Sequence, residues 1–145
     1  MHMQNGSRNA IMPPIPAWNP ELSVGNGHLD DQHRRILALG AKACGLREGA
    51  PGVRSEFHEV LNDLSELAAR HFADEELVLA RNNCPTLAAH KLEHERFREM
   101  LIGLVWRAEE GKLGMVALQE MLQAYLGNHL LEVDLPARAY MKHRR

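Results

Sequence analysis

The chain has 145 residues, of which 45% are hydrophobic, and a formal net charge of −2 at pH 7. A chain of this length forms one domain that buries roughly two-thirds of its unfolded surface, and its near-neutral charge gives no electrostatic reason to expect nucleic acid or an anionic membrane as a partner. No apolar run approaches the roughly 18 residues of a membrane span, and two cysteines are too few for a disulfide framework. We therefore expect a cytoplasmic protein, and its nine histidines are the unusual feature of the composition.

The two ends of the chain differ in composition from the middle. Residues 1–17 contain a run of prolines, which favours an extended or disordered arm over a helix. Residues 141–145 are rich in basic side chains and suit a C-terminal tail. The segment between them, residues 18–140, is expected to form the folded domain.

Four stretches of this domain have helical periodicity, and strand signals are absent. Asp30 or Asp31 is the expected N-cap of the first helix. Because the connections are short, neighbouring helices should be antiparallel, which predicts an all-α, up-down-up-down four-helix bundle. The expected helices cover about residues 30–47, 53–80, 86–110 and 115–134.

The second and third of these helices carry two closely spaced pairs of metal-ligating side chains. The pairs are His71-x3-Glu75 and His90-x3-His94, and on a helix the members of each pair lie on one face, one turn apart. The turn residues 82–85 separate them, so both pairs should meet at one end of a helical hairpin. Imidazole and carboxylate together suit zinc, iron and similar ions.

Histidines occupy bundle-seam positions on all four helices, because His33 and His129 also fall on apolar stripes. In an alternating topology all five of these histidines lie at the same end of the bundle, together with Glu75. Unpaired polar groups there would cost several kcal/mol in total. A purely structural hydrogen-bonded network is disfavoured, since apolar packing is usually the more stable arrangement, and the pattern predicts one polynuclear metal site.

Asp134 departs from the seam spacing. It follows His129 by five residues and would point roughly 140° away on a regular α-helix. It can join the site only if the helix loosens or ends there, and Pro136 makes such an end plausible.

Other polar residues near these positions are expected to face solvent. Glu76, Glu93 and Glu95 adjoin the predicted ligands but should point outward as solvated charges, and the same holds for His28 and the remaining histidines. Cys44 and Cys84 give no sign of reactivity.

The number and type of ligands bear on the metal. Ferritin-like di-iron sites use Glu-x-x-His motifs rather than His-x3-Glu, and a catalytic zinc site needs only about three protein ligands. The ligand set fits two octahedral ions that share two carboxylates. Affinity for divalent ions does not by itself select iron over manganese or zinc.

At this point the sequence closely resembles the hemerythrin family, specifically bacterial hemerythrins and hemerythrin-like domains. The resemblance covers about residues 18–140, and its combined motif is highly specific. The matching residues are Trp18-Asn19, Ser23-Val24-Gly25, Leu29-Asp30-Asp31-Gln32-His33, His71-Phe72-x2-Glu75-Glu76, His90-x3-His94-x2-Phe97 and His129-x4-Asp134.

The resemblance implies a cofactor of two Fe ions, cycling between Fe2+ and Fe3+ and bridged by an oxo or hydroxo group and by two carboxylates. Three histidines would hold the coordinatively filled iron and two would hold the iron with an open position, where O2 or other small ligands such as azide or NO would bind. The implied assignment is His90, His94 and His129 for the first iron, His33 and His71 for the second, and Glu75 and Asp134 for the bridges.

The resemblance also implies an apolar O2 pocket. Phe72, Leu126 and Leu130 match the family's lining of this pocket, and Tyr125 stands where the family usually has tryptophan. An apolar lining favours reversible binding, because it keeps out water and protons. The tyrosine hydroxyl near the site is a departure whose consequences for ligand binding and autoxidation stay open.

Several functions are compatible with this reading. The first is reversible O2 binding by a carrier, store or delivery protein, which is not an enzyme. The second is an O2- or redox-sensing input domain of a signalling protein such as a diguanylate cyclase or chemotaxis receptor, with a fused or separate output domain as partner. A peroxidase or oxidase is less favoured, because only Tyr125 is a candidate acid or base at the open iron. A metal store is disfavoured, because a fixed site holds just two ions.

Overall fold

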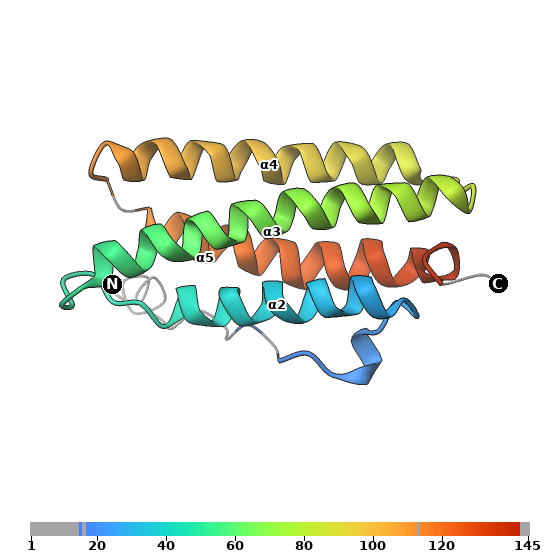
Figure 1. Ribbon diagram of the computed structural model, residues 1–145, viewed down its shortest axis with the longest axis horizontal. Helices are drawn as coiled ribbons and strands as arrows, with labels where there is room; N and C mark the ends of the chain where they lie inside the picture. The colour runs from blue at the N-terminus through green and yellow to red at the C-terminus, as the bar shows by residue number, and fades with distance from the viewer. Residues whose placement is uncertain (1–14, 16, 113, 143–145) are drawn as a thin grey trace, which may run out of the picture.

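The computed structural model describes residues 15, 17–112 and 114–142 of the chain. Its described residues form helices and contain no strand, so the predicted all-α class is confirmed. Four long helical segments run side by side along the molecule (Figure 1). In chain order the elements are η1 (Pro20–Leu22), α2 (Gly27–Cys44), α3 (Val53–Arg81), α4 (Leu87–Glu109), α5 (Met115–Ala124), η2 (Tyr125–Asp134) and η3 (Leu135–Tyr140).

The helices pack as a four-membered ring. α3 packs against α2 and α4, and α5 packs against the same two helices from the other side. Successive helices run in opposite directions, and α5 continues without a break into η2 and η3 (Figure 1). The up-down-up-down four-helix bundle is therefore confirmed.

The first long helix begins earlier than the sequence predicts. Its N-cap is Asn26, whose side-chain oxygen accepts hydrogen bonds from the backbone nitrogens of His28 and Leu29. The predicted N-cap at Asp30 or Asp31 is wrong, because Asp30 already lies in the first turn. Asp30 is buried and accepts hydrogen bonds from the Val24 backbone nitrogen and from a serine hydroxyl in the preceding loop. It fastens that loop to the helix.

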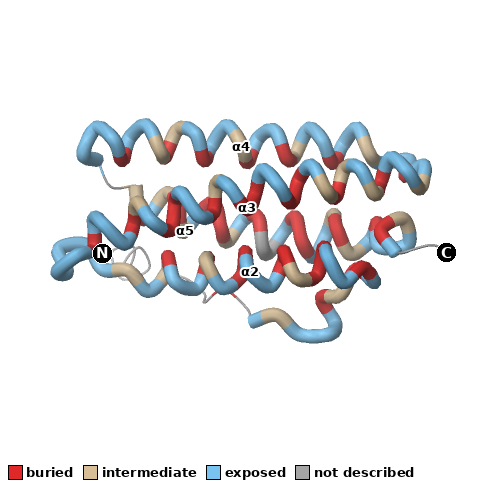
Figure 2. The backbone as a smooth tube through the Cα atoms, viewed as in Figure 1, coloured by how far each residue is buried: buried red, intermediate tan, exposed pale blue. Residues whose placement is uncertain are grey.

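The buried side chains form a continuous core along the bundle and a small second cluster at one end (Figure 2). The second cluster closes the bundle where α3 turns into α4 and where η3 ends. It consists of Val24, Leu29, Leu79, Cys84, Ala137 and Met141. Asn26 ties its two sides together by donating a hydrogen bond from its amide nitrogen to the Met141 carbonyl oxygen, 3.0 Å away.

The predicted terminal segments lie mostly outside the described residues. Of the N-terminal arm, residues 15 and 17 are described, and Ile15 is buried against the main core. Of the basic tail, residues 141 and 142 are described. Among the described helices, none has the length and apolar character needed to cross a membrane.

Candidate metal centre

All seven predicted ligands lie at one end of the bundle and are buried. They come from four different elements: α2, α3, α4 and η2. None is more than 1% exposed: His33, His71, Glu75, His90, His94, His129 and Asp134. Six of the seven, all except His94, contribute ligand atoms to two overlapping groups, each compact enough to hold a metal ion.

The first group joins α2 and α3 to η2. It comprises His33, His71, Glu75 and Asp134, and one ligand atom from each lies within 4.8 Å of the others. The His71 Nε2 atom is 3.2 Å from Glu75 Oε2, and the His33 Nε2 atom is 3.3 Å from Asp134 Oδ2 and 3.6 Å from Glu75 Oε2.

The second group joins α3 and α4 to η2. It comprises Glu75, His90, His129 and Asp134 within the same limit. Asp134 Oδ1 lies 3.0 Å from His129 Nε2 and 3.3 Å from His90 Nε2. His94 falls just outside this group, but its Nε2 atom is 3.1 Å from Glu75 Oε1. The structure therefore brings all three histidines to the same side of the carboxylates.

Each buried carboxylate divides its two oxygens between the groups. Glu75 presents Oε2 to the two histidines of the first group, and it presents Oε1 to the two histidines of the second group and to His94. His90, His94 and His129 are called the three-histidine group below, and His33 and His71 the two-histidine group. Asp134 presents Oδ2 to the first group and Oδ1 to the second. This is the arrangement that two ions bridged by two carboxylates require.

The inner atoms of the site also fit metal ions because several of them have no hydrogen-bond partner. Unsatisfied buried polar atoms cost about 1–3 kcal/mol each, and five of them converge here: His33 Nε2, His71 Nε2, His129 Nε2, Glu75 Oε2 and Asp134 Oδ2. Cations placed between these atoms would satisfy all five at once.

A change of helix type explains how Asp134 reaches the site. Residues Tyr125–Asp134 form a π-helix, in which residues five apart are hydrogen-bonded instead of residues four apart. His129 and Asp134 are five residues apart and therefore come onto the same face. The loosening that the sequence requires for Asp134 to join the site is present, and Pro136 follows it in η3.

The outward ring nitrogens of three histidines have polar side-chain partners. His94 Nδ1 donates to Glu76 Oε2 at 2.8 Å, and His129 Nδ1 donates to Glu93 Oε1 at 2.7 Å. The expectation that Glu76 and Glu93 point into solvent is therefore wrong, because both accept hydrogen bonds from the histidines. These bonds fix the ring orientation and leave Nε2 free to face the centre.

The outward hydrogen bond of His71 is part of a hydrogen-bond network that extends to the surface. His71 Nδ1 donates to Gln32 Oε1 at 2.8 Å, and Gln32 donates to Asp74 Oδ2, also at 2.8 Å. His28 donates to the same Asp74 oxygen at 2.7 Å. His28 is exposed as expected, whereas the roles of Gln32 and Asp74 were missed. Their position directly beside His33 and Glu75 in the sequence was the available signal.

The buried charges shift the pKa values of the site strongly in the absence of metal. Burial would lower the pKa of His33, but the Asp134 and Glu75 carboxylates raise it to about 9. Burial also opposes protonation of His129, whose pKa the same carboxylates raise to about 9. Conversely, burial would raise the pKa of Glu75, but the facing histidines hold it well below its ordinary range. Burial lowers the pKa of His71, so the histidines of the metal-free site do not all share one protonation state.

The predicted O2-pocket residues have different outcomes. Phe72 stacks on the ring of His94 at a centroid distance of 4.2 Å, and Tyr125 stacks on His129 at 5.0 Å. Leu130 is 1% exposed. The side chain of Leu126 lies outside the described residues. Phe72 and Tyr125 also line a cavity of about 20 Å³ among apolar side chains, and the Tyr125 hydroxyl has no hydrogen-bond partner.

Comparison with known proteins gives a consistent result. Residues 24–134 match the family model described as the Hemerythrin HHE cation binding domain. The chain is 30% identical over 117 residues to a Bacteriohemerythrin of Stenotrophomonas maltophilia, covering 78% of this chain and 72% of the relative. It is also 30% identical over 128 residues to a Bacteriohemerythrin of Clostridium acetobutylicum, covering 81% and 94%. A Hemerythrin-like protein of Naegleria gruberi is 26% identical over 118 residues, covering 81% and 87%. No solved structure gives a significant match.

Proposed function

This chain belongs to the hemerythrin family, and from that premise we propose that it is a non-heme di-iron protein that binds O2 reversibly at one open iron, as a carrier, store or delivery protein. The observation that carries the proposal is the division of the Glu75 and Asp134 oxygens between two groups of histidines. Two carboxylates that face both groups would hold two ions next to each other, and such a pair could supply the two electrons that O2 accepts.

The two ions would not be equivalent. In the proposed assignment, His90, His94 and His129 would hold one iron, and His33 and His71 would hold the other. Glu75 and Asp134 would serve both ions. The position with two histidines offers fewer protein ligands and would therefore leave room for an external ligand. When bound, the iron pair supplies the two electrons that O2 binding draws on.

The protein's own contribution is to position these ligands and to exclude water. Phe72, Tyr125 and Leu130 are all buried. The rings of Phe72 and Tyr125 cover His94 and His129 with apolar surface. Such a lining favours release of the bound gas unchanged, because water and protons that would promote its reduction are kept away. Among the described residues that line the apolar cavity, Tyr125 is the one that could act as an acid or base, and burial keeps the pKa of its hydroxyl well above its ordinary value. Binding is therefore favoured over catalysis.

An optical experiment tests this proposal. The iron-loaded protein is reduced without oxygen, O2 is admitted, and visible spectra are recorded before and after the gas is removed, with zinc-loaded protein as the colourless control. A charge-transfer band that appears with O2 and disappears on its removal is the expected result. Direct passage to a stable oxidised spectrum would contradict reversible binding and favour redox sensing or oxidase chemistry.

A further inference from the structure

The two groups of histidines differ in the charge of their outer hydrogen-bond partners. In the three-histidine group, His94 and His129 each donate from Nδ1 to a carboxylate, at 2.8 and 2.7 Å. In the two-histidine group, His71 donates to the neutral amide of Gln32, and the buried Nδ1 atom of His33 has no partner. Both anionic acceptors therefore lie on one side of the centre.

This difference has a direct chemical consequence. A carboxylate that accepts the outer N–H of an imidazole raises the electron density on the inner nitrogen and makes it a stronger metal ligand. A neutral amide does so less, and an unpaired nitrogen has neither this effect nor a fixed ring orientation. In the three-histidine group, His94 and His129 are thus the stronger donors, while His90 faces only the Thr86 carbonyl oxygen, 3.4 Å from its Nδ1 atom. This group also has one more histidine.

We propose that the two metal positions fill in a fixed order, the His90–His94–His129 position first, and that Glu76 and Glu93 are the positioning residues that set this order. The inference rests on the two-ion centre of the proposed function but not on O2 binding. It concerns divalent ions in general, because the donor strength of imidazole acts on any of them.

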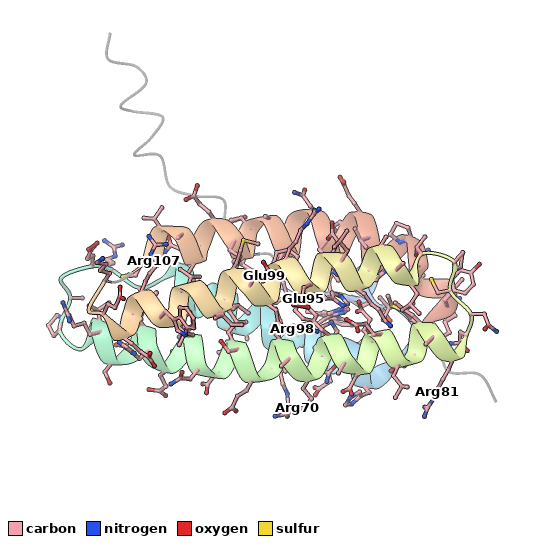
Figure 3. The ribbon with its side chains drawn as sticks, turned by 90° about the horizontal axis from the view of Figure 1, so that it is seen from above. Arg70, Arg81, Glu95, Arg98, Glu99 and Arg107 are labelled. Carbon is pink, nitrogen blue, oxygen red and sulfur yellow. The ribbon has the colours of Figure 1, made fainter. Side chains whose placement is uncertain are left out.

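The two glutamates should not contribute equally. Glu76 lies 3.7 Å from Arg98 Nη2, and Arg98 also pairs with Glu95, at 2.7 Å. Arg98 lies between α3 and α4, with Glu95 and Glu99 labelled beside it (Figure 3). The positive charge of Arg98 partly neutralises the Glu76 carboxylate and so weakens the effect of that carboxylate on His94. Glu93 pairs with no lysine or arginine among the described residues, so its effect on His129 should be the larger.

The test is a zinc titration of the metal-free full chain, followed by calorimetry and by nitrogen NMR of the histidine rings. In the natural chain we expect two resolved binding steps, with the rings of His90, His94 and His129 shifting in the first step. Glu93→Gln keeps an acceptor for His129 but removes the charge, and it should weaken the first step by about 10–100-fold. Glu76→Gln should weaken it less.

Two further variants make the test specific. Glu99→Gln removes the same charge from an exposed position on α4 that has no ion pair among the described residues, and it should leave both steps unchanged. Gln32→Glu gives His71 a carboxylate acceptor and should strengthen the second step instead. Thermal melts of each metal-free variant show whether it folds.

The outcomes separate this inference from the proposed function. Failure of the natural chain to take up a second ion would overturn both. Two ions that bind without order, or first at His33 and His71, would overturn the filling order and leave the di-iron centre standing. An equal effect of Glu93→Gln and Glu99→Gln would show that only net charge matters, which would also overturn the role of Glu93.

Discussion

At the end of the bundle where α3 begins, the seams between the helices are filled by apolar side chains such as Phe57, Leu61 and Leu118, each at most 2% exposed. At the opposite end the same seams carry histidines and carboxylates that are just as deeply buried. Figure 2 shows buried positions along the helices at both ends. Apart from Asp134, which the π-helix brings onto the seam, the spacing of the buried positions is the same at both ends, and the chemistry of those positions changes.

This difference teaches where the stability of the molecule comes from. Burial of apolar surface stabilises the first end whether or not metal is present. At the second end several buried polar atoms lack hydrogen-bond partners, so an ion that satisfies them should add to the stability of this end. Changes at the two ends should therefore separate stability from metal binding.

The largest expected effect is the loss of metal from a change at the polar end. Glu75→Gln removes the charge of a carboxylate that faces both groups, and bound iron should fall from two ions per chain to one or none. Iron analysis after dialysis measures this, and Glu99→Gln is the control that should retain two ions. Retention of two ions by Glu75→Gln would contradict the bridging role.

The matching change at the apolar end should act on stability alone. Phe57 is 0% exposed, and Phe57→Ala should cost about 3–5 kcal/mol of unfolding free energy, because it leaves a cavity. Urea unfolding of the metal-free and metal-loaded forms should show a similar loss in each. The iron content of the folded fraction should stay unchanged, and a fall in it would mean that the two ends are not independent.

A smaller effect should follow from pH, and only at the polar end. Because the pKa values of His33 and His129 are raised to about 9 from 6.5, protonation stabilises the metal-free fold below pH 6.5. This contribution is lost as the pH rises through 9, so the melting temperature of the metal-free protein should fall between pH 6.5 and 9.

Metal binding should have the opposite pH dependence to the stability of the metal-free protein. Ligands must lose their protons to bind an ion, so metal uptake at pH 7 should release protons and become tighter as the pH rises. Calorimetry in buffers of different ionisation enthalpy counts the protons released. An absence of proton release would show that His33 and His129 are already neutral in the metal-free protein.

The seam periodicity was sufficient to predict the four helices and the position of the predicted ligands at one end, because both depend on local spacing. It was not sufficient for features that depend on contacts between elements. Asp30 has the residue type of an N-cap, but its carboxylate is used by the preceding loop.

The outer shell of the site shows the same limit. Glu76 follows the predicted ligand Glu75, and Glu93 precedes the predicted ligand His94. Each therefore points to the side of its helix rather than to the bundle axis. Whether a flank faces solvent or a neighbouring helix depends on how closely α3, α4 and η2 pack, which periodicity does not determine. For Asp134 the sequence required only that the helix loosen or end, and the side-chain spacing did not show that the loosening takes the form of a π-helix.

The smallest expected effect concerns Tyr125, the aromatic residue that separates the polar end from the apolar core. Its buried hydroxyl has no partner, so Tyr125→Phe should raise the unfolding free energy by about 1 kcal/mol, as expected when an unsatisfied group is removed. Urea unfolding of the metal-free protein measures this. A loss of stability instead would mean that the hydroxyl holds a water molecule in the adjacent cavity of about 20 Å³. In that case water reaches Tyr125, whose ring stacks on the predicted ligand His129. Autoxidation of the iron-loaded protein should then be slower in the phenylalanine variant.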